Sequence, residues 1–547
     1  MKKLLFSFML AAIGATSAYT HDLGTGGIGH NVIGDKTLQA DNSRSRNLTA
    51  AAEMEAVPQQ IIQFEDEAVK ALCVQNWDTD GDGELSEAEA AAVTDLGRVF
   101  FHNYEITTFD ELRYFTGLTA ICNHAFDNCG LLTSVIIPNT VTSIGEQAFV
   151  GCKLTEINIP SSVTYIGIYA FAYIKTVTSI NIPKTVTAID YDAFGACSSL
   201  TSITVESDNP YYDSRDNCNA IIETASNTLI CGCMNTVIPN TVTIIDSFAF
   251  RDCTGLTSLT IPNSVKTIRS YAFTGCSGLT EVSFGNSVER ISFDSFQYCS
   301  SLRSVTIPKS ATDIGFGVFR GCTSLASITV ESGNPVYDSR DNCNAIIETA
   351  SNTMISGCMN SVIPNTVTAI FHHTFSECRT LTSIEIPNSV TSIGANAFYT
   401  CSELTIINIP SSVTTIGNNA FDYCNKLNDV YCYIEDLSTL SMGISVFHRS
   451  SLYNYNTRTL HVPEGTAVAY QEDNKWGSFF GTIVEMAHSG DVNGDSVVSI
   501  QDITTLIDYL LGAGSSSFNS YHADVNGDGV ITITDVTALI DKLLSGN

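Results

Sequence analysis

The chain has 547 residues, more than one ordinary hydrophobic core accommodates, so we expect either several domains or a solenoid. It carries 26 Lys and Arg against 57 Asp and Glu, a net charge of -31, which argues against nucleic acid and anionic membranes as partners. Only 15% of the residues are charged, a composition that suits a secreted protein rich in β-strands.

The beginning of the sequence has the pattern of a secretory signal peptide. Lys2 and Lys3 precede a short apolar run from Leu4 to Ala15, and small residues lead to Ala18. This run is too short to span a bilayer, and no later segment is apolar for long enough. We therefore expect a signal peptide at 1–18, no transmembrane anchor or direct membrane insertion, and a secreted, extracellular or cell-surface protein. Residues 19–58 are polar, Gly-rich and aperiodic, which predicts a flexible leader.

A calcium loop is predicted after this leader. The segment DTDGDGELSEAE follows a helix-like stretch and matches the EF-hand pattern, with Gly83 at its sixth position. The predicted ligands are side-chain oxygens of Asp78, Asp80, Asp82, Ser86 and Glu89 and the backbone carbonyl of Glu84. We expect residues 59–117 to form an EF-hand-like N-terminal cap over the first repeat. A degenerate loop that serves only as a cap is the alternative.

The centre of the chain is an internal repeat. A Phe marks each copy at a period of about 23 residues, a length typical of one solenoid coil per repeat. The repeat Phe positions are 126, 149, 171, 194, 250, 273, 296, 319, 375, 398 and 421, and the steps after 194 and after 319 are more than twice as long as the others. In each copy the phrase LTSIxIP alternates as a strand, Pro ends that strand, VTSIG is a second short extended segment, and Phe fills the coil. Since one coil cannot bury its own apolar face, residues 118–429 are predicted to stack as a repeat solenoid of parallel β-strands.

The two longer steps contain inserts, and each insert is predicted to be a β-hairpin. CNAIIETASNTLICGC begins at Cys218 and CNAIIETASNTMISGC at Cys343, each with TASN at the tip. A symmetric hairpin places Cys218 opposite Cys233 and Cys343 opposite Cys358, so a disulfide and a pair of free thiols both remain open there. The step from Phe194 to Phe319 equals that from Phe250 to Phe375, which indicates that a larger block was duplicated.

Ten of the 18 cysteines follow a repeat Phe by three residues. They are Cys129, Cys152, Cys197, Cys253, Cys276, Cys299, Cys322, Cys378, Cys401 and Cys424. Equivalent positions of stacked coils point in parallel, a poor orientation for disulfides. We therefore predict a ladder of small buried apolar residues.

The phrase IPxSVTxIGxxAFxxC, recurring from about Leu118 to Met486, resembles the BspA-type leucine-rich repeat proteins of bacterial surfaces. The resemblance implies a parallel-stranded solenoid that is secreted or surface-bound and takes part in adhesion to host or bacterial proteins. Residues 430–487 break the period and are predicted to form the closing cap.

The outward strand positions predict an even, small and polar surface without a charge cluster. One such column is Asn158, Asn181, Thr204, Thr260, Ser283, Thr306, Thr329, Glu385 and Asn408. A solvated sheet face and a face that binds protein or glycan both fit this pattern.

Two further calcium loops are predicted at the end of the chain, in DVNGDSVVSIQD and DVNGDGVITITD. Their side-chain ligands are Asp491, Asn493, Asp495, Ser499 and Asp502 in the first loop, and Asp524, Asn526, Asp528, Thr532 and Asp535 in the second. Val497 and Val530 contribute backbone carbonyls, and an amphipathic helix follows each loop. The sixth position is Gly529 in the second loop but Ser496 in the first, so we expect the first loop to bind Ca²⁺ more weakly, by about 1 kcal/mol.

A calcium loop followed by one helix occurs at Asp491 and again at Asp524, and this arrangement resembles a type I dockerin over residues 490–547. The resemblance implies a Ca²⁺-dependent fold that docks onto a cohesin module of another protein, often within a polysaccharide-degrading assembly. In dockerins the tenth and eleventh loop positions often touch the partner; here they are Ile500 and Gln501, and Ile533 and Thr534.

The ten His are scattered, and neither a phosphate-binding loop, a nucleophile elbow nor a HExxH motif occurs, so we expect no catalytic residues. The sequence favours an exported, non-catalytic binding or adhesion protein. Its repeats bind protein or glycan, and its Ca²⁺-dependent tail tethers it to a cohesin-like module or another surface protein. The alternative is a structural spacer in an extracellular assembly.

Overall fold

The computed structural model describes residues 60–448, 458–463, 465–486, 490–493, 497–513, 518–526 and 530–545. The expected signal peptide and leader lie outside the described residues, as do Asp495, Ser496, Asp528 and Gly529. None of the helices in the described part of the chain is both long enough and apolar enough to span a bilayer.

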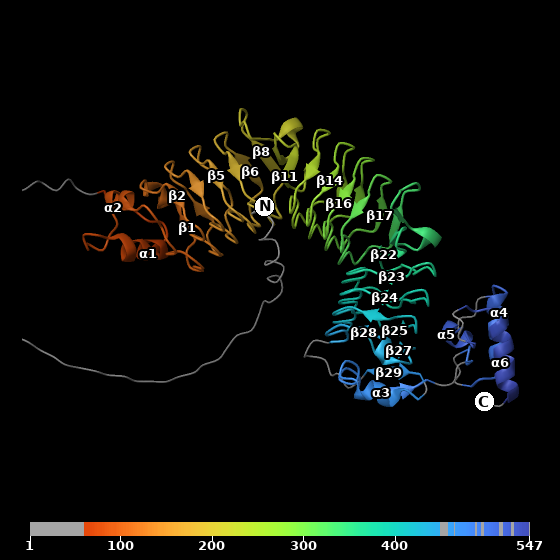
Figure 1. Cartoon of the computed structure of the whole chain (residues 1–547). Coiled ribbons are helices and arrows are strands. Elements are labelled where there is room, and N and C mark those ends of the chain that lie inside the picture. Colours follow the sequence, from red (N-terminus) through yellow and green to blue (C-terminus); the bar gives the residue numbers. More distant parts are fainter. Residues whose placement is uncertain are drawn as a thin grey trace, which may run out of the picture. The chain divides into compact units, whose positions relative to one another are not determined.

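Short parallel strands that follow one another in chain order form a β-solenoid, as predicted (Figure 1). The pairing has the period of the sequence, because Ser179 pairs with Ser202 and Thr267 pairs with Arg290, in each case one repeat further along the chain. Each coil contributes to two sheet faces, one from the LTSIxIP phrase and one from VTSIG.

The strands of the LTSIxIP face pair in parallel in five groups. They are β1 (Thr108–Phe109) with β3 (Ser134–Val135); β6 (Ser179–Ile182) with β8 (Ser202–Val205); β13 (Ser258–Thr260) with β15 (Glu281–Ser283); β17 (Ser304–Ile307) with β19 (Ser327–Val330); and β25 (Ile406–Ile409), β27 (Asp429–Cys432), β29 (Thr459–Val462) and β30 (Thr482–Glu485).

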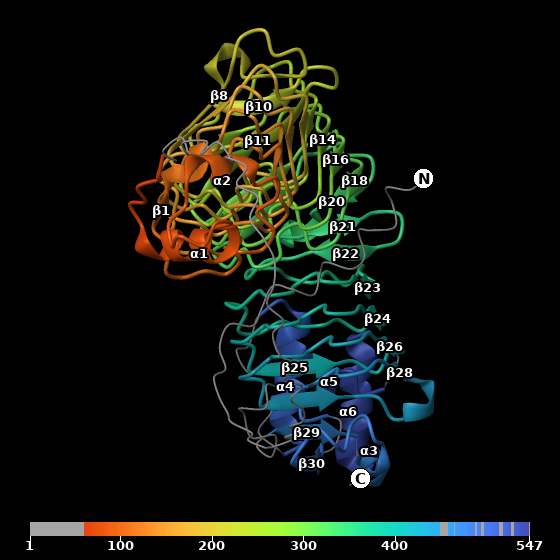
Figure 2. The same ribbon diagram turned by 90° about the vertical axis from the view of Figure 1, so that its left-hand side faces the viewer.

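The VTSIG strands form three sheets, and Figure 2 shows β14, β16 and β18 side by side. The first has β2 (Ala120–Ile121), β4 (Ser143–Ile144), β5 (Tyr165–Ile166) and β7 (Ala188–Ile189); the second has β9 (Tyr212–Asp213), β10 (Ala220–Glu223), β11 (Thr228–Gly232), β12 (Ile244–Ile245), β14 (Thr267–Ile268), β16 (Arg290–Ile291) and β18 (Asp313–Ile314); the third has β20 (Tyr337–Asp338), β21 (Ile346–Glu348), β22 (Thr353–Ser356), β23 (Ala369–Ile370), β24 (Ser392–Ile393), β26 (Thr415–Ile416) and β28 (Ser441–Met442).

The core is a stack of equivalent side chains. In β6, Ser179 and Asn181 are exposed while Ile180 and Ile182 are buried, which is the alternation predicted for LTSIxIP. The repeat Phe rings stack between neighbouring coils, for example Phe149 on Phe171 with centroids 5.3 Å apart. The stack also includes Phe100 before the first predicted repeat and Phe447 after the last, so the core is continuous on both sides of residues 118–429.

The segments that border the repeats close the core at its two ends. At the first end lie α1 (Glu67–Trp77), α2 (Glu87–Ala92) and the 3₁₀ turn η1 (Asp110–Tyr114). At the other end, β29 and β30 extend the parallel sheet and α3 (Ala467–Glu472) packs beside β30. The fully buried guanidinium of Arg458 donates to the carbonyls of Leu427 and Cys424, both at 3.1 Å. It thus provides hydrogen-bond donors for backbone carbonyls of the last coil. The turn η4 (Leu437–Thr439) lies in this segment.

Both inserts form the predicted hairpins, and their second strands join the solenoid. Glu223 pairs with Thr228, which leaves TASN at the tip, and β11 pairs in parallel with β12. A β-bulge shifts the register beyond Ile222, so Ile221 faces Cys231 and the Cys233 thiol donates to the carbonyl of Asn219. Short turns η2 (Arg215–Asn217) and η3 (Arg340–Asn342) precede the two hairpins.

The cysteines are all unbridged. The symmetric pairing of Cys218 with Cys233 fails because of the bulge, and the second hairpin has the same shift, with the Cys358 thiol donating to the carbonyl of Asn344. The predicted ladder is confirmed as a row of buried thiols. Most of them also donate to the Phe carbonyl of the preceding coil, as Cys152 does to Phe126 at 3.1 Å, so the ladder is hydrogen-bonded rather than purely apolar.

Candidate calcium-binding loops and binding surfaces

The first candidate loop lies between α1 and α2, and each of these helices has a side-chain cap at its N-terminus. Asp66 caps α1 by accepting hydrogen bonds from the backbone N–H groups of Ala68 and Val69. Ser86 caps α2 in a capping box with Glu89. The candidate loop from Asp78 to Glu89 thus follows the C-terminal end of α1 and runs into the capped first turn of α2.

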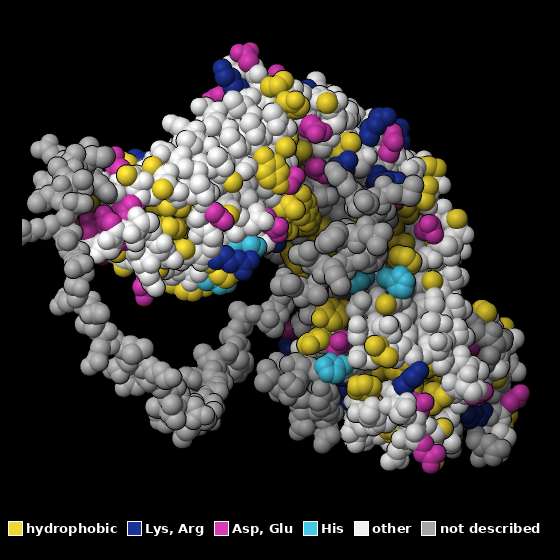
Figure 3. All heavy atoms as spheres, turned by 60° about the vertical axis from the view of Figure 1, so that its left-hand side comes forward, with side chains coloured by type: hydrophobic (Ala, Val, Ile, Leu, Met, Phe, Trp, Pro, Cys, Tyr) yellow, Lys and Arg dark blue, Asp and Glu magenta, His cyan; other side chains and the backbone are white. Residues whose placement is uncertain are grey.

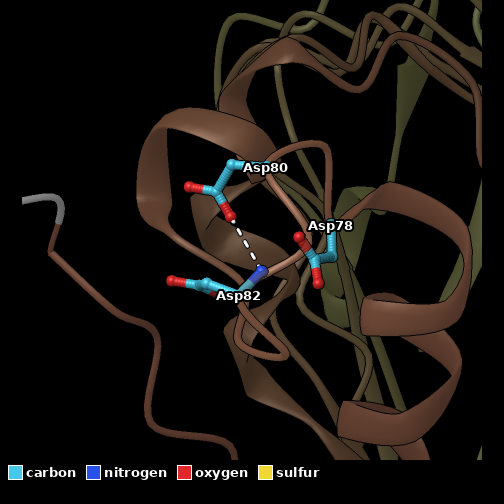
Figure 4. Close-up of side chains that lie close together, drawn as sticks. All are labelled: Asp78, Asp80 and Asp82. Atoms are coloured by element: carbon cyan, nitrogen blue, oxygen red, sulfur yellow. Dashed lines mark hydrogen bonds between the residues drawn. The ribbon is translucent and has the colours of Figure 1, made fainter.

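Three carboxylates converge in this loop (Figure 4). Asp78, Asp80 and Asp82 each have an oxygen within 4.8 Å of an oxygen of the other two. Asp78 also accepts hydrogen bonds from the N–H groups of Gly81 at 2.6 Å and Gly83 at 2.9 Å, and both glycines have positive φ, which lets the chain wrap round the carboxylate. The cluster supplies the hard oxygen donors that Ca²⁺ prefers.

The neighbouring groups in this loop shift the pKa values of two of its carboxylates. The N–H of Asp82 hydrogen-bonds to Asp80 and lowers its pKa, but desolvation and the charges of Asp82, Glu89 and Asp78 together raise the pKa of Asp80 above its usual value. Burial raises the pKa of Glu89, but hydrogen bonds from Ser86 and Thr79 outweigh it and lower this pKa to about 2. A divalent cation would relieve the repulsion among these carboxylates.

The other predicted ligands of this loop have separate roles. The Ser86 hydroxyl is buried and donates to Glu89 Oε2 at 2.9 Å, so it is engaged as a helix cap. The Glu84 side chain forms an ion pair with Lys70 at 2.7 Å, while the predicted calcium ligand at this position is its backbone carbonyl.

The loop is hydrogen-bonded to residues 60–62, and the helix before it contacts the first coil, which the sequence pattern did not reveal. Ile62 N–H donates to the carbonyl of Leu85 at 2.9 Å, and Glu87 N–H donates to that of Gln60 at 2.8 Å. On the other side, Asp66 accepts a 2.6 Å hydrogen bond from Thr107 N–H, and the Trp77 ring packs edge-on against Phe115 at 5.4 Å. The loop is therefore part of the end of the repeat core.

The two terminal loops share one hydrogen-bond pattern. Asp502 accepts hydrogen bonds from the N–H groups of Asn493 at 2.9 Å and Ser499 at 2.7 Å. Asp535 accepts the equivalent hydrogen bonds from Asn526 at 3.2 Å and Thr532 at 2.8 Å. The carboxylate at the twelfth position thus closes each loop onto its third and ninth positions. Both carboxylates are fully buried.

The predicted helices follow these loops. They are α4 (Ile500–Leu510) and α6 (Ile533–Ser545), with the short α5 (Ser520–Ala523), which the sequence did not predict, between them. Leu506 of α4 and Leu539 of α6 are fully buried in one small core, as their spacing predicts. Asp491 is also buried, while the described donors Asn493, Ser499, Asp524, Asn526 and Thr532 lie on the loops.

Exposed apolar side chains recur at equivalent positions in the two halves of this tail. Ile500 and Ile533 are 77% and 67% exposed, and Leu511 and Leu544 are 78% and 81% exposed. Val497 and Val530 form a third such pair. Only their backbone carbonyls, and not their side chains, are predicted calcium ligands. These exposed apolar pairs are the candidate contact surface of the tail.

The polar column of the solenoid is as predicted, and it is internally hydrogen-bonded. All its members except the half-buried Asn408 are exposed. Thr204 donates to Asn181 at 2.8 Å, and the hydroxyls of Thr306 and Thr329 are 3.0 Å apart. The column ends beside Tyr431, whose ring stacks on His461 with centroids 4.1 Å apart. Figure 3 shows a surface that is largely white, the colour of the backbone and of other side chains, with scattered hydrophobic groups.

Comparison with known protein families finds two kinds of module in the chain. The BspA type leucine rich repeat region matches residues 94–219, 228–343 and 353–465, and the dockerin type I domain matches residues 489–544. Both are non-catalytic binding modules, and dockerin domains generally bind Ca²⁺ and cohesin modules. None of the curated proteins matches the chain.

Several solved structures of leucine-rich repeat proteins are similar to the chain. A cell surface protein from Faecalibacterium prausnitzii has 22% identity over 64% of this chain and 84% of its own, with a TM-score of 0.41. A protein from Eubacterium ventriosum has 25% identity over 56% of this chain and 80% of its own, with a TM-score of 0.40. A protein from Bacteroides ovatus has 22% identity over 70% of this chain and 88% of its own, with a TM-score of 0.32. The repeat matches cover more than half of the sequence, and the chain belongs to the BspA-type leucine-rich repeat family.

Proposed function

We propose that this chain is an exported, non-catalytic binding protein. Its solenoid binds a protein or a glycan of a host or bacterial surface, and its tail tethers it to a cohesin-type partner. The observation that carries the proposal is the pairing of a large solenoid with a small tail that has two closed acidic loops and exposed apolar side chains. The expected signal peptide and secretion are part of the same proposal.

Calcium has three proposed sites. The first uses Asp78, Asp80, Asp82, Ser86, Glu89 and the Glu84 carbonyl. The tail sites use Asp491, Asn493, Asp495, Ser499, Asp502 and the Val497 carbonyl, and Asp524, Asn526, Asp528, Thr532, Asp535 and the Val530 carbonyl. When bound, Ca²⁺ neutralises the clustered carboxylates and so stabilises the folded loops.

The exposed apolar pairs of the tail are the proposed contact with the partner. Ile500 and Ile533 are the first residues of equivalent helices and the tenth residues of equivalent loops, so an ordered loop fixes the position of each Ile. Burial of an exposed Ile in an interface contributes on the order of 2 kcal/mol. Calcium therefore promotes partner binding, because it orders the loops from which α4 and α6 begin.

A Ca²⁺-dependent pull-down tests this function. The full chain, and residues 488–547 alone, are incubated with an immobilised cohesin module in Ca²⁺ or in chelator. Capture in Ca²⁺ that is lost in chelator supports the proposal, whereas equal capture in chelator contradicts it. Residues 60–488 are assayed separately on cells and matrix proteins. Absence of specific binding there would leave the solenoid as a spacer within an extracellular, polysaccharide-degrading or other assembly.

A further inference from the structure

A row of aromatic rings, which we call the aromatic ridge, follows one corner of the solenoid. Its members lie two or three residues before a repeat Phe, and neighbouring ring centroids are 4.9 to 5.7 Å apart. They are Tyr169, Tyr191, Phe248, Tyr271, Phe293, Phe316 and His373. The row continues past both inserts. Tyr191 is 46% exposed and Phe316 is 42% exposed, so the ridge is accessible to a partner.

Several ridge residues have backbone conformations that bulky side chains disfavour. Tyr169, Phe248 and Tyr271 have φ of 54°, 62° and 61°. Asn396 and Asn419 occupy the equivalent step in later coils with φ of 55°, and Asn accepts this conformation more readily. The aromatic residues thus keep a strained backbone where a polar residue fits the fold, which indicates a role for the rings themselves.

A cavity of about 120 Å³ opens beside Tyr191 and Phe248, where the first hairpin joins the solenoid. Asp190, Asp192, Asp246 and Arg251 are its charged lining residues, and the Cys231 thiol also lines it. Asp246 pairs with Arg269 at 2.7 Å, and Asp190 accepts a 2.6 Å hydrogen bond from the Tyr165 hydroxyl. Three acidic side chains beside the guanidinium groups of Arg251 and Arg269 leave the cavity with an excess of one acidic group.

Asp192 is the residue of this cavity with unused hydrogen-bonding capacity. Its side chain is 1% exposed, and Arg251 Nη1 donates to its Oδ2 at 2.7 Å. Its buried Oδ1 has no hydrogen-bond partner. A Cβ added to Gly195 would lie 1.8 Å from this oxygen, so Oδ1 can occupy its position only because residue 195 is a glycine. A buried carboxylate oxygen without a donor is costly, and a ligand with a donor group would remove that cost.

The ridge already binds one cation of the chain itself. The Arg251 guanidinium carbon lies 5.1 Å from the Tyr173 ring centroid, 5.4 Å from that of Phe248 and 6.0 Å from that of Tyr169. Aromatic faces next to carboxylates are the usual environment for ammonium and guanidinium groups. The net charge of -31 would in addition attract a basic partner from a distance.

The volume limits what enters the cavity. A cavity of about 150 Å³ accepts a guest the size of benzene. The cavity here therefore accepts the end of one side chain, such as the four methylenes and ammonium of lysine, and excludes a pyranose ring.

The duplicated block offers a matched site that lacks these features. At the equivalent positions of the second block, Gly315, Gly317, Phe371 and Ser376 replace the four charged lining residues, and Ser356 replaces Cys231. The cavity at that second junction is only about 10 Å³. The first junction thus has both the charged lining residues and the larger cavity. The second junction lacks these four charged residues and has a much smaller cavity.

We propose that the aromatic ridge and the cavity beside Tyr191 form a docking site for a basic, extended polypeptide. One lysine of this partner enters the cavity and donates to Asp192 Oδ1, and its neighbours lie along the ridge. This site is independent of the Ca²⁺-dependent tail.

Binding of a labelled peptide to the full chain tests the proposal. The probe is a short fluorescein-labelled peptide of serine, threonine and lysine, measured by fluorescence anisotropy, and the control peptide has glutamine in place of lysine. Asp192→Asn removes the acceptor charge, and Cys231→Leu fills the cavity without a change of charge. Each should weaken lysine-peptide binding by about tenfold or more.

Two control variants keep the site intact. Tyr104→Ala removes an exposed ring that does not belong to the ridge, and Glu281→Gln removes an exposed carboxylate that does not line the cavity. Both should bind the peptide within about twofold of the unmodified chain. Circular dichroism and thermal unfolding confirm that each variant is folded.

Three results would overturn the proposal: folded Cys231→Leu and Asp192→Asn proteins that both bind like the unmodified chain, a glutamine peptide that binds as tightly as the lysine peptide, or an oligosaccharide that binds with the same dependence on Asp192 and Cys231. The first means that general surface charge attracts the peptide, and the others mean that the site does not select a cation.

Discussion

Asp502 Oδ1 accepts a 2.9 Å hydrogen bond from the N–H of Asn493, so the last position of the first tail loop is bound to its third position. Loss of this carboxylate should both open the loop and remove a calcium ligand. We expect Asp502→Asn to lower Ca²⁺ affinity by roughly tenfold or more at that loop. Calorimetric titration of the full chain measures this, with Asp508→Asn on α4 as the control. Equal affinity in both variants would show that Asp502 is not a ligand.

The first loop should lose stability in acid because of Glu89. Its folded pKa of about 2 lies below the ordinary value of a glutamate. The carboxylate therefore contributes stability above pH 4 to 5, and this contribution is lost as the pH falls toward 2. In Ca²⁺-free buffer, the fluorescence of Trp77, which packs on the first coil, should change over this window. Glu89→Gln should flatten that part of the curve. An unchanged curve would contradict the role of Glu89, and Glu87→Gln on the same helix is the control.

The thiols should be numerous, free and unreactive in the folded protein. All 18 cysteines are unbridged, and burial raises the pKa of several of them, for example that of Cys129 to about 12. Thiolate is the reactive form, so alkylation should be slow until denaturant is added. After denaturation without reductant, intact mass should show one alkyl group for every cysteine of the chain. Fewer groups, restored to the full number by reductant, would show that disulfides exist.

Asp192 should make the solenoid less stable as the pH rises toward neutrality. Burial raises its pKa to about 7, although Arg251 and Asp252 also act on it, in opposite directions. A raised folded pKa favours the folded state fully below about pH 4, and that contribution is lost as the pH rises through about 7. Denaturant unfolding between these pH values measures the trend, and Asp192→Asn should reduce it. A trend of the same size in Asp192→Asn would assign it to other groups.

The repeat architecture could be predicted from the sequence because two periodicities coincide. Alternation within LTSIxIP sets which side chains are buried, and the regular recurrence of Phe sets the stacking, as the pairing of Ser179 with Ser202 in the next coil shows. The loop ligands stay a prediction from spacing, since an EF-hand pattern is local in sequence.

The remaining features depend on contacts that spacing does not encode. The register of the hairpins could not be predicted, because one bulge residue displaces Cys233 from its symmetric position. The aromatic ridge was missed because its members stand at two different offsets from the repeat Phe. Asp192 and Arg251 are separated by 59 residues and meet only because an insert folds out between their coils.

The most direct test of the central claim is the helical signal of residues 488–547 in far-ultraviolet circular dichroism. The account predicts a weak signal in chelator and a gain of helix when Ca²⁺ is restored, because α4 and α6 both begin at calcium loops. A fully helical tail in chelator, or a tail without helix in excess Ca²⁺, would contradict it.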